Sequence, residues 1–472
     1  MLVHSKIDFS RKVIDWDGFG FNYVETAQTV DYTQDPQDYG GFSILSPEKR
    51  EEILQLVFGE EGLRPNTVKM FLDPFQQQES QLNEPGAGNL DQRNYDHEIT
   101  TKWMRYFVKE GFRLTEQQGR PFEVITTLYG PPPFMTSQKL MRGRDLNPVY
   151  KEELAKYMTA RVRYLRDEEH LPVKYISIHN EGEDYSRWPE DGSHGDIGTG
   201  HDYNLYWTPE AVADFLPLLR QVLDANGCEE IGVTPGETSN WTRFSHWGYA
   251  GEIADNPEAV KALGLITSHG FSGGMMAQKW YGDHRSAGAD QLRALRPELH
   301  SWVTSTSWSK MDAEFVYQIY ENIYCAKNNS IIPWAGIQRP PKWVGGDPNP
   351  GNAIQVMEDG SYEVRDGYYY YKQVCPVGQA GMYAAKTYST NTSCCAIAFA
   401  SNGTSNPDCF ILVNTSDEEA RFDLSVLHGS SRYQVTRTAP GEHGVNLENA
   451  VLTDGKLLYT APANSVTTFV AK

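Results

Sequence analysis

The sequence predicts an α/β protein: a parallel (β/α)8 TIM barrel with an attached antiparallel β-sandwich. Between residues 18 and 338 eight apolar, β-branched strands alternate with amphipathic helices, which is the pattern of a parallel barrel. From about residue 386 short strands follow one another across Asn, Gly, Ser and Asp turns, with no helical pattern between them. A doubly wound open sheet is the alternative, but the Gly-rich turn typical after its first strand is missing. We therefore expect a barrel over 18–385 and a β-sandwich from 1–17 plus 386–472.

The expected elements follow in order along the chain. Residues 7–24 come first and are expected to form one or two strands, bent at Gly18 and Gly20. Ser46-Pro47-Glu48 and Thr208-Pro209-Glu210 each start a helix, because Ser or Thr caps the first turn and Pro fits its first position. Further helices are expected over 99–110, from 147, over 257–263 and over 312–326. Barrel strands are expected over 67–72, 122–128, 173–181, 230–234, 264–268, 299–304 and 330–337.

Composition and charge narrow the function classes. Asp and Glu number 62 against 42 Lys and Arg, a net charge of −20, which argues against nucleic acid as a partner. No segment approaches the roughly 18 apolar residues of a membrane span, so no membrane partner is expected. The first residues lack the apolar core of a signal peptide, which predicts either a cytoplasmic protein or a secreted protein whose signal peptide is absent from this sequence. The six cysteines show no metal-like spacing and are expected to be mostly reduced, with a disulfide involving Cys394, Cys395 or Cys409 left open.

The stretch Val173–Glu181 is the strongest candidate for a catalytic element. It is apolar and β-branched up to Ile178 and then turns polar at His179-Asn180-Glu181. In α/β barrels the active site is built at the carboxyl ends of the strands. Glu181 is therefore predicted to be a catalytic acid/base.

The other strand ends supply carboxylates, amides and aromatic rings rather than a Cys/His cluster. Retaining glycosidases need one carboxyl group as acid/base and a second about 5–5.5 Å away as nucleophile. Aromatic side chains provide apolar platforms for sugar rings, and the stretch after Glu181 adds Trp188. The residues at the strand ends are Asn22 and Tyr23, Lys69 with Asp73, Tyr129, Asn180-Glu181, Glu237, His269, Ser305 and Trp334. The candidate substrate-binding residues are Asn180, Lys69, Tyr129, Glu237, Trp241, His269, Trp334 and Trp188.

Several motifs resemble clan A retaining glycoside hydrolases, and most closely glycoside hydrolase family 30. Asn180-Glu181 at the end of a fourth barrel strand resembles the acid/base signature of the clan. Tyr129-Gly-Pro-Pro-Pro-Phe-Met135 resembles the turn after the third strand of the family. Tyr368–Met382 resembles the end of its barrel, and Phe410–Thr415 its attached sandwich. The likeness covers most of the chain, although each motif is loose.

This resemblance implies a second Glu as nucleophile at the end of the seventh strand, and the chain departs from it there. The strand reads Leu299-His-Ser-Trp-Val-Thr-Ser-Thr-Ser-Trp308, with Ser305 at the nucleophile position. A hydroxyl without a base beside it cannot replace an ionised carboxylate. Lys69 stands where the clan usually has Arg, and Glu237 is the rival nucleophile.

The expected function is that of a retaining glycoside hydrolase acting on a β-linked glycoside, with no cofactor and no metal. The favoured hypothesis is a nucleophile-replaced variant that binds but barely hydrolyses its substrate, or that acts as a glycosynthase. Asn180 would hydrogen-bond the 2-hydroxyl of the sugar. One alternative is a natural non-catalytic carbohydrate-binding protein with Ser305 native. Another is a metal-dependent hydrolase using His179, Glu181 and His269. The sugar, the linkage and the oligomeric state stay open.

Overall fold

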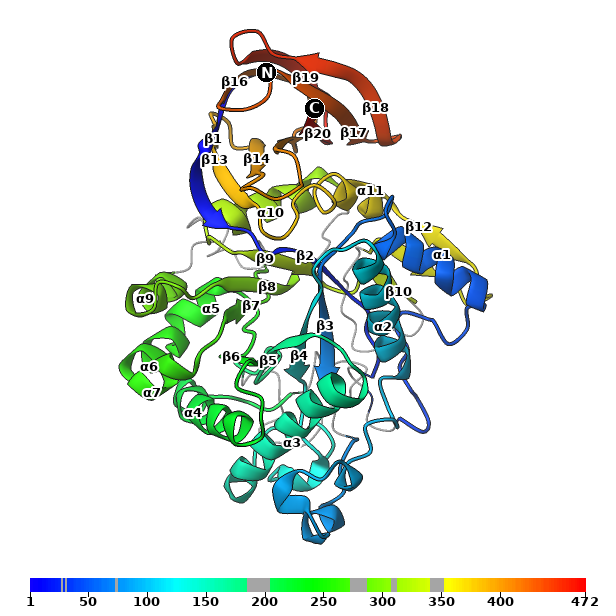
Figure 1. Cartoon of the computed structure of the whole chain (residues 1–472), viewed down its shortest axis with the longest axis vertical. Coiled ribbons are helices and arrows are strands. Elements are labelled where there is room, and N and C mark those ends of the chain that lie inside the picture. Colours follow the sequence, from blue (N-terminus) through cyan, green and yellow to red (C-terminus); the bar gives the residue numbers. More distant parts are fainter. Residues whose placement is uncertain are drawn as a thin grey trace.

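The computed structural model describes residues 1–26, 29, 32–72, 75–184, 204–271, 287–306, 312–339 and 352–472. A (β/α)8 barrel fills one end of the molecule, and a β-sheet domain that holds both termini lies at the other (Figure 1). The predicted fold class is confirmed. Within the described residues, no helix combines the length and apolarity needed to cross a membrane.

The barrel consists of eight parallel strands, in the spatial order β6-β5-β4-β3-β2-β9-β8-β7. Isolated parallel bridges from Val233 to Leu263 and from Thr238 to Ser268 link the two ends of this order. The strands are β2 (Gly18–Asn22), β3 (Thr67–Leu72), β4 (Glu123–Leu128), β5 (Val173–Ser177), β6 (Gly232–Thr234), β7 (Ile266–Ser268), β8 (Ser301–Thr306) and β9 (Ser330–Pro333).

Helices surround the strands, and two of them begin with the side-chain caps that the sequence predicts. Ser46 accepts a hydrogen bond from Lys49 N, and Thr208 accepts one from Ala211 N. The α-helices are α1 (Pro47–Phe58), α2 (Lys102–Gln117), α3 (Lys151–Arg163), α4 (Pro209–Ala225), α5 (Trp241–His246), α6 (Tyr249–Asp255), α7 (Pro257–Ala262), α9 (Ala287–Leu295), α10 (Ala313–Tyr324) and α11 (Asp366–Lys372). Short 3-10 turns are η1 (Glu79–Asn83), η2 (Ala87–Asn89), η3 (Gln92–Asn94), η4 (Pro133–Met135) and η5 (Pro148–Tyr150), and η6 (Tyr164–Glu168) is a π-helical turn.

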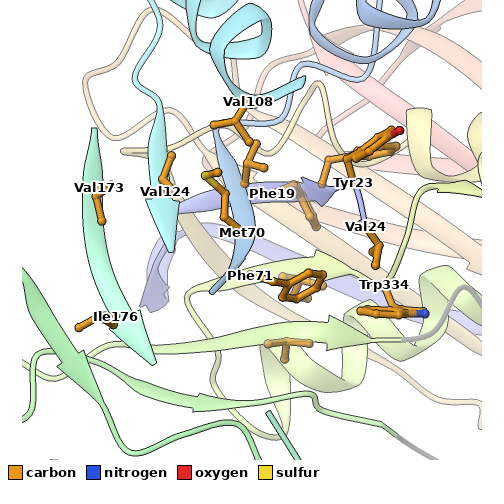
Figure 2. Close-up of a cluster of buried hydrophobic side chains, with 14 of the residues drawn as sticks. Phe19, Tyr23, Val24, Met70, Phe71, Val108, Val124, Val173, Ile176 and Trp334 are labelled. Carbon is orange, nitrogen blue, oxygen red and sulfur yellow. The ribbon is translucent and has the colours of Figure 1, made fainter. Parts of the chain in front are cut away.

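Two layers of apolar side chains hold the barrel together. Inside it, Ile125, Leu265, Trp302 and Ile332 form a closed cluster that fills the interior. Outside it, a large core joins the strands to the helices, and Figure 2 shows part of this core around Met70, Val108 and Val124. Because the interior is packed with side chains, it is not a pore, and a ligand site is expected at the carboxyl ends of the strands.

The second domain is one curled sheet of nine strands, in the order β18-β17-β20-β15-β14-β13-β1-β16-β19. All of its pairs are antiparallel except β1 with β16, so the sheet is mixed. The exception arises because β1 comes from the opposite end of the chain, where no hairpin fixes its direction. The strands are β1 (Leu2–Asp15), β13 (Tyr383–Ser389), β14 (Cys394–Ala400), β15 (Cys409–Asn414), β16 (Ala420–Leu427), β17 (Arg432–Ala439), β18 (Glu442–Val451), β19 (Lys456–Ala461) and β20 (Ser465–Ala471).

The structure also contains a third, small sheet and free cysteines. The small sheet consists of β10 (Ile337–Gln338), β11 (Ile354–Val356) and β12 (Tyr362–Val364). Cys394, Cys395 and Cys409 are buried free thiols, so none of them forms the disulfide that the sequence left open.

Candidate active site

Six of the predicted site residues meet at the carboxyl ends of the barrel strands. Lys69 lies in β3 and Ser305 in β8, whereas the others follow β5, β6 and β7 directly. All six side chains are at most 3% exposed. The group consists of Lys69, Asn180, Glu181, Glu237, His269 and Ser305.

Lys69 is the centre of this group. Its Nζ donates to Asn180 Oδ1 and to Ser305 Oγ, each at 3.1 Å, and forms a short ion pair with Glu237 Oε2. Neither charged side chain is exposed. A buried ammonium needs such an anion, because desolvation of an unpaired charge costs several kcal/mol.

Glu237 is held as an ionised carboxylate. Thr127 Oγ1 donates to Oε1, and Oε2 receives Lys69 Nζ and, at 3.2 Å, His269 Nε2. Burial alone would raise the pKa of Glu237, but the Lys69 charge and the His269 hydrogen bond outweigh it and lower the pKa to about 2. With both oxygens engaged by donors, Glu237 acts here as a fixed counter-ion.

His269 connects the two carboxylates. Its Nδ1 lies 2.9 Å from Glu181 Oε1, and its Nε2 lies 3.0 Å from Asn180 Oδ1. Burial would lower the pKa of His269, but the charge and hydrogen bond of Glu181, together with Glu237, raise it above 6.5. Both ring nitrogens face acceptor oxygens, so the geometry favours the doubly protonated imidazolium. His269 Nδ1 is therefore within reach to pass a proton to Glu181 Oε1.

The backbone around Glu181 is fixed by the neighbouring strand end. Glu181 N donates to Glu237 O at 2.7 Å, and Glu237 N donates to His179 O at 2.9 Å. Glu181 itself has φ = +50°, an uncommon left-handed conformation for a residue that is not glycine. Next to it, His179 accepts from Gly182 N through Nδ1, and burial lowers its pKa to about 3. His179 is therefore a neutral packing residue.

Ser305 faces the group because of an irregularity in β8. The ladder with β9 pairs Val303 with Ile331 and Thr306 with Pro333, so β8 has one residue more over this step. Such a bulge changes the direction of a side chain at a sheet end. The hydrogen-bond partner of Ser305 is the Lys69 ammonium, which can only donate and cannot accept the hydroxyl proton.

Three of the four predicted aromatic residues, Tyr129, Trp241 and Trp334, are buried in the main core. Tyr129 and Trp334 both contact Phe71, with ring centroids 4.3 and 5.9 Å from it, and Figure 2 labels Phe71 beside Trp334. Trp241 belongs to the same main core as Tyr129 and Trp334, and its Nε1 donates to Asn322 Oδ1 at 3.3 Å. Trp188 lies outside the described residues.

Two supporting features were not predicted. Thr127 donates a hydrogen bond to Glu237, and the signal that could have found it is the pair of hydroxyl residues Thr126-Thr127 near the end of the strand. Glu183 accepts hydrogen bonds from Ser239 N and Oγ, both at 2.7 Å, and pairs with Arg243. This second cluster joins the segment after β5 to the one after β6, and no sequence spacing indicates it.

A hollow of about 360 Å³ opens on the segments that follow β3 and β4. Its lining combines apolar, amide and charged side chains, including Phe75, Gln77, Glu79 and Lys139. Among the residues that the structure describes, no group of three His, Cys, Asp or Glu has an arrangement suited to a metal ion.

Comparisons with known proteins support the same fold. No protein-family model and no curated protein matches the chain. Among solved structures, a family 30 endoxylanase from Clostridium papyrosolvens C71 has a TM-score of 0.67 at 16% identity, covering 99% of this chain and 100% of that one. A conserved exported protein from Bacteroides fragilis has a TM-score of 0.73 at 14% identity, covering 99% and 100%. An endo-β1,6-glucanase has a TM-score of 0.67 at 15% identity, covering 99% and 94%.

These similarities define the class of scaffold. The chain has the barrel-plus-sheet architecture of family 30 glycoside hydrolases, which is what the sequence motifs predicted. At identities of 14–16% the likeness concerns the fold. The reaction has to be inferred from the side chains of this chain.

Proposed function

We propose that the protein binds a β-linked oligosaccharide at the carboxyl end of its barrel and belongs by descent to the retaining glycoside hydrolases. The observation that carries this proposal is the buried cluster of Glu181, His269, Glu237 and Lys69 on four strand ends of a glycosidase scaffold. Xylan and β1,6-glucan are the first substrates to try, because enzymes of similar fold are named for them.

Glu181 has the role of acid/base in this proposal. A general acid must hold a proton when the leaving oxygen departs, and His269 Nδ1, 2.9 Å from Glu181 Oε1, can supply it. In the second step the Glu181 carboxylate would take a proton from water. Asn180 is fixed because its Oδ1 receives both Lys69 and His269, and its Nδ2 would donate to the 2-hydroxyl of the sugar.

The chain lacks the second half of the double displacement. Ser305 is a poor nucleophile. An alcohol needs a base that removes its proton, and the hydrogen-bond partner of Ser305 is the Lys69 ammonium, which is no base. Glu237 offers a charge but has its oxygens engaged by Thr127, Lys69 and His269. Hydrolysis by the unaltered chain is therefore expected to be very slow while saccharide binding persists.

The test restores the missing carboxylate. Ser305→Glu should hydrolyse at least one member of a panel of nitrophenyl β-glycosides, on the order of 10²-fold or more faster than Ser305→Gln. Ser305→Gln is the matched control, because it has the same size and no charge. Adding Glu181→Gln to Ser305→Glu should remove the gained activity.

The same experiment decides the rival function. A non-catalytic carbohydrate-binding protein is favoured by one observation, the internal pairing of both carboxylates beside the Ser305 hydroxyl. Saccharide binding without any hydrolysis by Ser305→Glu would support that rival. Absence of binding to xylo-, cello- and gentio-oligosaccharides would contradict both functions.

A further inference from the structure

Asn22, at the end of the first barrel strand, has a buried side-chain amide whose hydrogen-bonding groups are unsatisfied. It is fully buried, and neither Oδ1 nor Nδ2 has a hydrogen-bond partner among the described residues. Of the buried side-chain amides that the structure describes, Asn22 alone lacks a partner at both polar atoms. Buried amides normally find partners, because an unsatisfied donor or acceptor bears the full cost of its desolvation.

The strand register places this amide at the candidate site. Asn22 pairs with Lys69 in the parallel ladder of β2 and β3, and paired residues of neighbouring strands project on the same face. Lys69 projects into the barrel, where it contacts Glu237 and Ser305. Asn22 is therefore the neighbour of Lys69 on the inner face.

A glycine in the same strand supports this direction independently. A Cβ on Gly20 would meet the side chain of Ile332, which belongs to the cluster filling the barrel interior. Asn22 lies two residues further along β2 and shares the face of Gly20. On the other side of β2, Gly18 pairs with Ser330, and extending this register brings Asn22 level with Trp334.

We propose that Asn22 is a saccharide-binding residue of this site, with its Oδ1 accepting from one sugar hydroxyl and its Nδ2 donating to a neighbouring one. The inference rests on the proposed function and names a contact beyond it. A neutral polyhydroxylated ligand fits, because the amide offers one acceptor and one donor and carries no charge. The aromatic Trp334 at the same level would contact the apolar face of the sugar ring.

The proposal makes stability and binding change in opposite directions. An amide that is unsatisfied until ligand binds destabilises the ligand-free protein, so an apolar side chain of similar size should be tolerated there. Asn22→Leu should therefore keep or raise Tm in the absence of saccharide. The same variant should bind saccharide about 10-fold or more weakly, since two hydrogen bonds are lost.

Asn329→Leu is the matched control. Asn329 is also buried, at the other end of the barrel, but its Oδ1 accepts from Ser301 N at 2.8 Å and its Nδ2 donates to Asp15 O at 2.9 Å. Its replacement should lower Tm by several degrees and leave saccharide affinity unchanged. Asn22→Ala serves as a second variant that removes the amide without adding bulk.

The measurements are calorimetric melting of each full-length variant and titration calorimetry with xylotetraose, cellotetraose and gentiotetraose. A drop in Tm of Asn22→Leu and Asn22→Ala comparable with that of Asn329→Leu would assign Asn22 a structural or water-binding role and overturn the proposal. Unchanged affinity in both variants, with a wild-type protein that does bind, would also overturn it while leaving the proposed function intact. Failure of the wild-type protein to bind any of the three oligosaccharides would refute the proposed function itself.

Discussion

The charge balance of the site depends on single residues, and Lys69 is the residue whose loss should matter most. Lys69→Met would remove the nearer of the two cations that face the buried Glu237, and loss of one partner of a buried ion pair typically costs about 3–5 kcal/mol. Glu237→Gln would likewise leave the Lys69 ammonium buried without its carboxylate partner. The double variant Lys69→Met/Glu237→Gln should lose less free energy of unfolding than the two single variants lose together. Urea denaturation of all four proteins gives the coupling, and strictly additive losses would contradict a direct ion pair.

His269 should make stability decrease toward alkaline pH. Its folded-state pKa is raised above 6.5 by Glu181 and Glu237, so the folded protein holds this proton more tightly than the unfolded chain. The stabilisation is complete below pH 6.5 and is lost as the pH rises through the folded-state value. His269→Gln should flatten this decline in denaturation midpoints measured from pH 6 to 9. The charged groups that face His269 are Glu181 and Glu237, which raise its pKa, and Lys69, which lowers it.

Glu237 and His179 should make the protein labile in acid. The pKa of Glu237 is lowered to about 2, so its stabilisation is present above pH 4.5 and is lost as the pH falls toward 2. The pKa of His179 is lowered to about 3 by burial, so the unfolded chain takes up this proton first and stability also falls below pH 6.5. Glu237→Gln should lose the part of the acid dependence between pH 4.5 and 2. A variant with an unchanged acid profile would contradict this assignment.

At the level of strands and turns, a glycine at the end of β6 positions both His179 and Glu237. Gly236 has φ = +91°, and a Cβ there would lie 2.1–2.6 Å from the His179 ring. Gly236→Ala would therefore combine backbone strain with a steric clash and should cost about 2 kcal/mol or more. Gly227→Ala is the control, because φ is also positive there at +69° but no atom lies within 4 Å of the added carbon. Equal losses in the two variants, measured by urea denaturation, would argue against the packing contact.

The strands and helices with strong local patterns are the ones that the sequence predicts well. The strand 67–72 and the helix starts at Ser46-Pro47 and Thr208-Pro209 agree with β3, α1 and α4. Strands β18 and β19 have no counterpart in the sequence-based expectation, because their side chains are mostly exposed and the apolar alternation is weak. The inward direction of Ser305 depends on the bulge in β8, which hydrophobic periodicity does not encode.

The sequence predicts which residues form the site better than it predicts which of them contact one another. Strand-end positions identified Lys69, Glu181, Glu237, His269 and Ser305 as one group, since parallel strands bring their carboxyl ends together. Their pairing could not be predicted, because it depends on side-chain reach across the barrel: Lys69 in β3 contacts residues after β5 and β6 and in β8. For Lys69 the sequence left two possible partners, Asp73 and Glu237, and the structure shows the pair with Glu237, whereas Asp73 lies outside the described residues.

Across the whole molecule, the barrel and the sheet domain share one core. Side chains of β14 alternate: Ala396 and Ala398 face the sheet domain's own core, whereas Cys395, Ile397 and Phe399 join the barrel core. Helices α10 and α11 lie between the two parts (Figure 1). Because separation would expose this apolar layer to water, we expect the two parts to unfold together.

Tyr324 at the end of α10 provides the sharpest test of that coupling. Its hydroxyl donates to Ala385 O at 2.9 Å and accepts from Ala398 N at 3.0 Å, and so joins the helix to β13 and β14. Tyr324→Phe would leave two buried backbone groups without this partner and should cost about 1–3 kcal/mol. Tyr317→Phe on the same helix is the control, since its hydroxyl has no hydrogen bond to a described residue, and it should change stability little. In scanning calorimetry Tyr324→Phe should shift one transition to lower temperature, and a split into two transitions would show instead that the barrel and the sheet domain unfold independently.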